Sequence, residues 1–186
     1  MRFEFSAGGI VYRKSPDLQI LVCQHSQHHG WVFPKGLIGD TDGNKHQTKS
    51  ASAKSYGPAS QSSSEASETK EEAALREVKE EAGIEARIEQ KLEPVTYWYV
   101  WKGDPSASVR PVRDSQDKQD KNSGRVKIKK TVYYYTMKAV GGNITEHDNE
   151  MEEVEWIDFE DVEKRLTYPS DKKAWVEAKA LISKIP

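Results

Sequence analysis

Hydrophobic and polar positions along the chain switch between two spacings. Short runs rich in β-branched and aromatic residues predict strands over residues 9–13, 19–23, 31–33, 84–88, 95–101, 131–137 and 154–157. Apolar residues at helical spacing predict a helix within residues 68–84, a short helix over residues 159–166 and a last helix from Ser170. We therefore expect the α/β class, with a mixed sheet packed between helices in one domain that spans residues 1–186.

Two segments break this alternation because they are almost entirely polar. Residues 40–67 contain eight serines and one aromatic residue, and residues 103–124 have the same polar character. Neither segment can bury enough apolar surface to offset the entropy lost on ordering it. We expect residues 40–67 to form a mobile loop. Residues 103–124 lie between two strand-like runs and are predicted to be a long hairpin loop.

Composition narrows the class of protein. The chain has 186 residues, 35% of them apolar, and no apolar run approaches the roughly 18 residues of a membrane span. The N-terminus lacks the layout of a signal peptide, and one cysteine cannot form an internal disulfide, so we expect a cytoplasmic protein with no membrane partner. A net charge of −2 gives no basic field for DNA, although residues 124–130 are locally basic.

The stretch ETKEEAALREVKEEAGI, residues 68–84, holds six glutamates. On a helix, Glu77, Glu80 and Glu81 fall within an arc of roughly 100°, beside an apolar face. Like charges at this spacing repel each other, so a solvated acidic face remains the alternative to a ligand site. Hard oxygen ligands converging from one face suit Mg²⁺ or Mn²⁺. Arg76 could hold the Glu77 carboxylate by a bidentate contact.

At these residues the chain resembles the Nudix hydrolases, whose box reads G-x5-E-x7-R-E-U-x-E-E-x-G-U, with U an aliphatic residue. Residues 68 and 76–84 match the second half of that box at every fixed position. The box glycine resembles Gly36, but 31 residues instead of five separate it from Glu68, which indicates that the serine-rich segment is inserted into the box loop. Residues 6–9 are similar to the first strand of the family.

The resemblance implies an α/β/α sandwich and a set of site residues. Glu77, Glu80 and Glu81 would be metal ligands, with the Lys35 carbonyl as a further candidate. Arg76 would orient these carboxylates, Glu68 would support the metal or water network, and Gly83 would leave the helix with a positive φ. The family often adds an acid from a loop before a strand that contains a tryptophan. Here Glu153 and Glu155 are the candidates, chosen over Glu150 and Glu152, and a solvated acidic loop is the alternative. The general base stays open.

Other residues resemble the branch of the family that cleaves dinucleoside polyphosphates. The resemblance lies in residues 31–36, in residues 130–135 and in the pair His28-His29, which makes His29 a candidate for substrate binding. Strand alternation places Lys130 on the same face as Tyr134, so Lys35 and Lys130 could bind phosphates while Tyr134 stacks on a base. The alternative for the aromatic residues is simple packing in the sheet.

Several functions remain open at this point. Within the hydrolase class, the alternatives are an RNA 5′ end, which we consider a weaker candidate partner, a diphosphoinositol phosphate and an oxidised nucleotide. Outside it, the chain could sense a nucleotide without cleaving it. The three carboxylates and Arg76 favour catalysis, because a silent domain needs no such repulsion. The spacing of His25, His28 and His29 matches no zinc site, and Cys23 lies in an apolar run that predicts packing.

Overall fold

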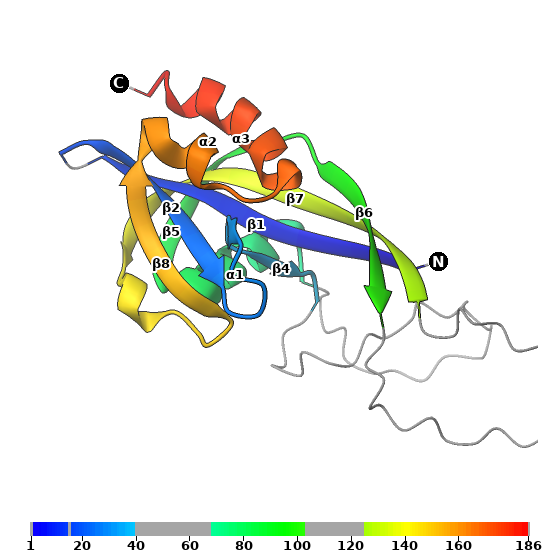
Figure 1. Cartoon of the computed structure of the whole chain (residues 1–186). Helices are drawn as coiled ribbons and strands as arrows, with labels where there is room; N and C mark the ends of the chain where they lie inside the picture. The colour runs from blue at the N-terminus through cyan, green and yellow to red at the C-terminus, as the bar shows by residue number, and fades with distance from the viewer. Residues whose placement is uncertain (1, 15, 40–67, 103–124, 186) are drawn as a thin grey trace, which may run out of the picture.

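The computed structural model describes residues 2–14, 16–39, 68–102 and 125–185. The loops predicted at residues 40–67 and 103–124 therefore lie outside the described residues. The strands are β1 (Arg2–Lys14), β2 (Leu18–His25), β3 (Trp31–Val32), β4 (Lys35–Leu37), β5 (Ile84–Lys91), β6 (Val95–Lys102), β7 (Arg125–Gly142) and β8 (Met151–Asp158). The helices are α1 (Lys70–Ala82), α2 (Val162–Arg165) and α3 (Pro169–Ile182), with 3-10 turns at Ile144–Glu146 and Phe159–Asp161. Figure 1 shows their arrangement.

All eight strands belong to one mixed sheet. Its central path runs β3-β2-β1-β7-β5, with β4 paired to β1, β6 to β7 and β8 to β2. Strands β1 and β7 are parallel along most of β1, while the other pairs are antiparallel. Lys102 at the end of β6 lies opposite Arg125 at the start of β7, so the strands that flank residues 103–124 form the predicted hairpin. Both β1 and β7 extend well beyond the predicted runs, because the polar and apolar residues that flank these runs continue the same ladders.

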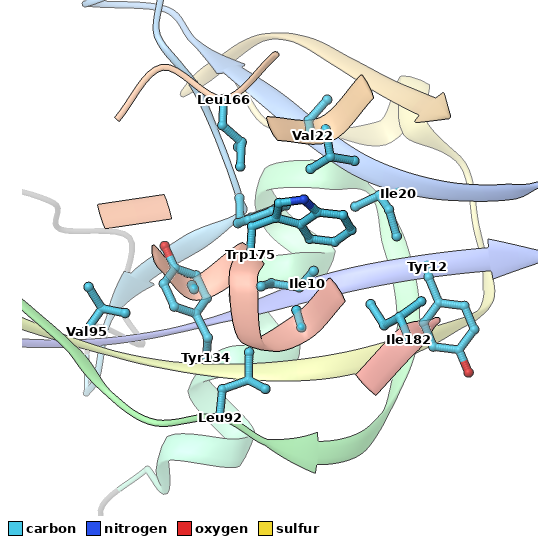
Figure 2. Packing of buried hydrophobic residues seen from close by; sticks show 14 of the residues in the cluster. Ile10, Tyr12, Ile20, Val22, Leu92, Val95, Tyr134, Leu166, Trp175 and Ile182 are labelled. Atoms are coloured by element: carbon cyan, nitrogen blue, oxygen red, sulfur yellow. The ribbon is translucent and has the colours of Figure 1, made fainter. Parts of the chain in front are cut away.

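Helices cover the sheet on both faces, which confirms the predicted α/β/α arrangement (Figure 1). Alternation along β1 sends Ile10 into one core and Val11 into the other. The core of Ile10 is closed by α3, whose Trp175 lies among aliphatic side chains of several strands (Figure 2). The core of Val11 is closed by the alanines and Val78 of α1. The helix predicted over residues 159–166 is a 3-10 turn followed by the single turn α2.

Within the part of the chain that the structure describes, no helix is long and apolar enough to span a bilayer. The cytoplasmic location inferred from the sequence stays a prediction.

Candidate active site

The ends of α1 are fixed by local signals, and they set the position of the glutamates. Thr69 caps the start, since its side chain accepts from the Glu72 backbone while the Glu72 carboxylate reaches back to the Thr69 N–H. At the other end Gly83 has φ 68°, which confirms the predicted positive φ, and its N–H donates to the Lys79 carbonyl at 2.9 Å. Glu77 and Glu81 therefore lie in the last two turns of the helix.

Arg76 forms hydrogen bonds with three of the acidic residues. Its Nε and Nη2 donate to the two carboxylate oxygens of Glu68 at 2.7 and 3.1 Å, which is a bidentate contact. Its Nη1 donates to Glu77 at 2.7 Å and to Glu80 at 3.2 Å. The bidentate partner is thus Glu68, which precedes the helix, and not Glu77 as predicted. Glu68 also accepts from the Gly39 N–H at 2.7 Å, so it ties the two sides of the 40–67 segment together.

Glu77 is buried against the backbone of β4. It is 7% exposed, and a Cβ at Gly36 would overlap its carboxylate, so only glycine allows this approach. Burial raises the pKa of Glu77 to about 7, although the neighbouring Arg76 guanidinium opposes the shift. Gly36 of the first half of the box therefore contacts Glu77 of the second half, although a long segment separates the two halves in sequence.

Glu81 is the more deeply buried of the two, at 2% exposed. Burial raises its pKa well above the usual value, and the positive charge of Lys35 opposes this. The Lys35 backbone N–H donates to the Glu81 carboxylate at 2.7 Å, which connects α1 to β4. Glu80 is different, because its side chain is 45% exposed.

These carboxylates fit a divalent cation by their chemistry. Two of them lie in surroundings that oppose their negative charge, and a bound cation would stabilise that charge. Glu77, Glu80 and Glu81 would hold it, with the Lys35 carbonyl as a further predicted ligand. Among the residues that the structure describes, no group of three Asp, Glu, His or Cys side chains is arranged closely enough to hold a metal ion as the side chains stand. Arg76 donates to both Glu77 and Glu80, which orients the two carboxylates.

Lys35 and Lys130 lie close to these carboxylates. The Lys35 ammonium donates to the Phe33 carbonyl at 3.2 Å and lies 3.5 Å from the Asp171 carboxylate. Burial lowers the pKa of Lys130, and the charge of Lys35 lowers it further. Within the described ranges Lys130 forms no ion pair, although Glu4, Glu81 and Glu77 act on its pKa from a distance. The pair thus provides positive charge beside the carboxylates.

Tyr134 does not lie where base stacking would require it. Its ring is 1% exposed, packs edge-on to Phe33 and donates its hydroxyl to Asp171 at 3.0 Å. A base has no free face of this ring to stack on, so the predicted role of Tyr134 is wrong and its role is packing. Tyr97, which lies opposite Lys130 in the β6–β7 ladder and is half-buried, is the aromatic residue that lies beside the lysines.

Glu153 and Glu155, the predicted additional acids, lie on β8. The Glu155 carboxylate pairs with Arg165 at 2.9 Å, and Glu153 is exposed. The structure does not bring either of them to Glu77. Glu150, which precedes β8, is nearer, since its charge contributes to the raised pKa of both Glu77 and Glu81. The Asp148 N–H donates to the Glu80 carbonyl at 2.8 Å and holds this loop against α1.

His29 lies in the turn between β2 and β3, where it has φ 53°. Its Nδ1 contacts the Glu152 carboxylate at 2.6 Å on the surface, and no contact joins it to the box glutamates within the described residues. The His25 and His28 rings stack at 4.1 Å. Cys23 is fully buried, as expected for a packing residue.

Sequence reasoning passed over two acidic residues near the lysines and the glutamates. Glu150 was set aside in favour of Glu153 and Glu155, and its loop position gave no periodic signal. Asp171 belongs to the start of α3, where an acidic residue is ordinary, and only the fold brings it to Lys35.

Comparison with known proteins gives consistent matches. The family described as "NUDIX domain" matches residues 3–178. A protein of Mycobacterium tuberculosis (strain CDC 1551 / Oshkosh) that bears the name MutT4 is 31% identical over 121 residues, which are 65% of this chain and 40% of that protein. The chain therefore spans less than half the length of this relative.

Solved structures share the fold over nearly the whole chain. A Caenorhabditis elegans Ap4A hydrolase in a binary complex has a TM-score of 0.57 and 19% identity, covering 98% of this chain and 99% of that one. The Escherichia coli ORF135 protein has a TM-score of 0.53 and 18% identity, covering 100% and 95%. A Nitrosomonas europaea NUDIX hydrolase has a TM-score of 0.53 and 12% identity, covering 98% and 91%. At these identities the likeness shows the fold alone.

Proposed function

Because this chain belongs to the NUDIX domain family, we propose that it is a pyrophosphohydrolase that cleaves dinucleoside polyphosphates, such as diadenosine tetra- to hexaphosphate, with Mg²⁺ or Mn²⁺ and releases ATP. The observation that carries this proposal is the pair Lys35 and Lys130 beside two buried carboxylates. A long polyphosphate would meet both groups at once, through the lysines directly and through a cation at the glutamates.

The aromatic residue beside the lysines supports a nucleotide as the substrate. Tyr97 lies opposite Lys130 on the adjacent strand, and its ring centroid is 6.3 Å from that of Tyr99. An adenine could stack on an amphipathic ring of this kind while its phosphates extend toward Lys130. The named activity of the Caenorhabditis elegans hydrolase, which shares the fold, agrees with this choice.

The reaction is the attack of water on a phosphorus atom and the departure of a nucleoside polyphosphate. A bound divalent cation supplies charge neutralisation at the phosphates and a more acidic water. Lys35 and Lys130 stabilise the negative charge on the phosphate oxygens. A carboxylate of the cluster accepts the proton of the attacking water as the phosphoanhydride bond breaks. Arg76 holds Glu77 and Glu80 on the same side of the helix while this occurs.

The test is a substrate panel with product chromatography at equal concentrations. Diadenosine tetra- and hexaphosphate are compared with ADP-ribose, oxidised dGTP, 5′-triphosphate RNA and diphosphoinositol phosphate, each with Mg²⁺, with Mn²⁺ and with a chelator. We expect the highest kcat/KM for the dinucleotides, with ATP among the products and no turnover under chelation. If another compound exceeds them about tenfold in kcat/KM, the substrate proposal is wrong.

A further inference from the structure

Asp171 is a buried carboxylate that the proposed chemistry does not use. It lies in the first turn of α3 and is 1% exposed. Its Oδ1 accepts from the Phe33 backbone N–H at 3.2 Å and from the Tyr134 hydroxyl at 3.0 Å, while its Oδ2 accepts from Ser170 at 3.1 Å. The Lys35 ammonium lies 3.5 Å from Oδ1. A carboxylate is this deeply buried only where donors and a counter-charge surround it.

Two carboxylates from helices on opposite faces of the sheet hold one short segment, Phe33-Pro34-Lys35. The Asp171 carboxylate of α3 accepts from the Phe33 N–H. The Glu81 carboxylate of α1 accepts from the Lys35 N–H at 2.7 Å. Between them Pro34 has no N–H to satisfy, and its carbonyl accepts from Gly9 at 3.1 Å. One backbone group of each residue in this segment is therefore held, by α3, by β1 and by α1 in chain order.

The Lys35 side chain folds back within this arrangement. Its ammonium donates to the carbonyl of Phe33, and the Asp171 carboxylate lies beside it. Lys35 has four rotatable bonds, and an ammonium on such a chain is placed only by the groups that bind it. Asp171 is the carboxylate that pairs with this ammonium, and the same oxygen also holds the backbone of the segment.

We propose that Asp171 is a positioning residue of the active site, which holds the Lys35 ammonium and the Phe33-Pro34-Lys35 segment in place for the substrate phosphates. The proposal rests on the proposed function, because it assigns Lys35 to phosphate binding. Asp171 acts through Lys35 and does not itself touch the substrate. A purely structural Asp171, which only fastens α3 to the sheet, would affect folding without acting through Lys35.

The experiment is a double-mutant cycle of Asp171→Asn and Lys35→Met, read out as kcat and KM. Asparagine keeps an oxygen that can accept from Phe33 and Tyr134 but removes the charge. We expect Asp171→Asn to raise KM about tenfold with kcat changed by less than about threefold, as for a ground-state contact. In the Lys35→Met background, the same change should alter KM less than about twofold, since the residue through which Asp171 acts is gone. Equal effects in both backgrounds would overturn the proposal.

Two controls separate positioning from folding. Ser170→Ala removes the hydroxyl at the other oxygen of Asp171 and should leave both constants within about twofold of the parent. Unfolding midpoints of all four proteins of the cycle are measured as well. If Asp171→Asn fails to fold alone but folds together with Lys35→Met, the pair is coupled as proposed. If it fails to fold in both backgrounds, Asp171 is structural and the proposal is overturned.

The cycle also keeps the proposal apart from the choice of substrate. It is run with whichever phosphoanhydride of the panel the parent protein cleaves best, so another substrate would overturn the proposed function and leave the test of Asp171 intact. If the parent cleaved none of them, the coupling of Asp171 to Lys35 in the unfolding midpoints would still decide whether the two residues act together.

Discussion

Replacing Glu77 by Gln should stabilise the cation-free protein, by an amount that depends on pH. Burial raises the pKa of Glu77 from its usual value of 4.5 to about 7. Below pH 4.5 the carboxyl is protonated in both the folded and the unfolded chain, and no difference arises. Between pH 4.5 and about pH 7 the folded chain holds a proton that the unfolded chain has lost, so the free energy of unfolding falls as pH rises. Above about pH 7 the whole loss of stability persists.

The size of this effect follows from the same shift. At about 1.4 kcal/mol per pKa unit, the charge of Glu77 costs roughly 3 kcal/mol above pH 7. Glutamine has the same shape without the charge, so the variant should gain up to about that amount at pH 8 and almost nothing at pH 4. For a chain of this size the gain corresponds to roughly 6–12 °C in Tm.

The assay is thermal unfolding of both proteins from pH 4 to pH 9 in a chelating buffer, and then with excess Mg²⁺. Glu80→Gln is the matched control, because the Glu80 side chain is 45% exposed and also contacts Arg76; its curve should follow the parent curve. Added Mg²⁺ should raise the Tm of the parent more than that of Glu77→Gln. Parallel Tm curves for the parent and Glu77→Gln at all pH values would refute the reasoning.

Three further outcomes are expected from assays of turnover. Lys130→Met should weaken cleavage, through a higher KM if the contact is made in the ground state or a lower kcat if it strengthens in the transition state, and unchanged constants would remove Lys130 from the site. Glu150→Gln should lower kcat by at least about tenfold, whereas Glu155→Gln should change it little; the reverse order would restore the acid of β8 as the functional one. Gly36→Ala should lower both Tm and kcat, because its Cβ would overlap the Glu77 carboxylate, and a variant with parental constants would contradict that packing.

The sequence could predict those parts of the site that depend on local periodicity. Helical spacing alone places Glu77 and Glu81 near each other, and Gly83 signals the end of the helix, as the structure confirms. The partner of Arg76 could not be predicted in the same way. Glu68 stands outside the helix, and its orientation depends on Gly39, which is distant in sequence.

Residues placed by long-range contacts were the ones that sequence reasoning misjudged. Alternation shows that Tyr134 faces the same side as Lys130, but it cannot tell where a helix covers that face, and α3 covers Tyr134. The β2–β8 ladder shifts its register between Gln24 and His25, so counting along β8 does not show which glutamate approaches α1. Asp171 meets Lys35 only because α3 folds back over the sheet.

The hydrogen bond between Gly39 and Glu68 has a practical consequence for engineering this protein. It joins the two residues from which the 40–67 segment departs and to which it returns, just as Lys102 and Arg125 are paired across the 103–124 segment. At both places the ends of the connection are held together by the body of the domain. Such positions tolerate the insertion of a foreign domain, because a fused reporter need not stretch the scaffold.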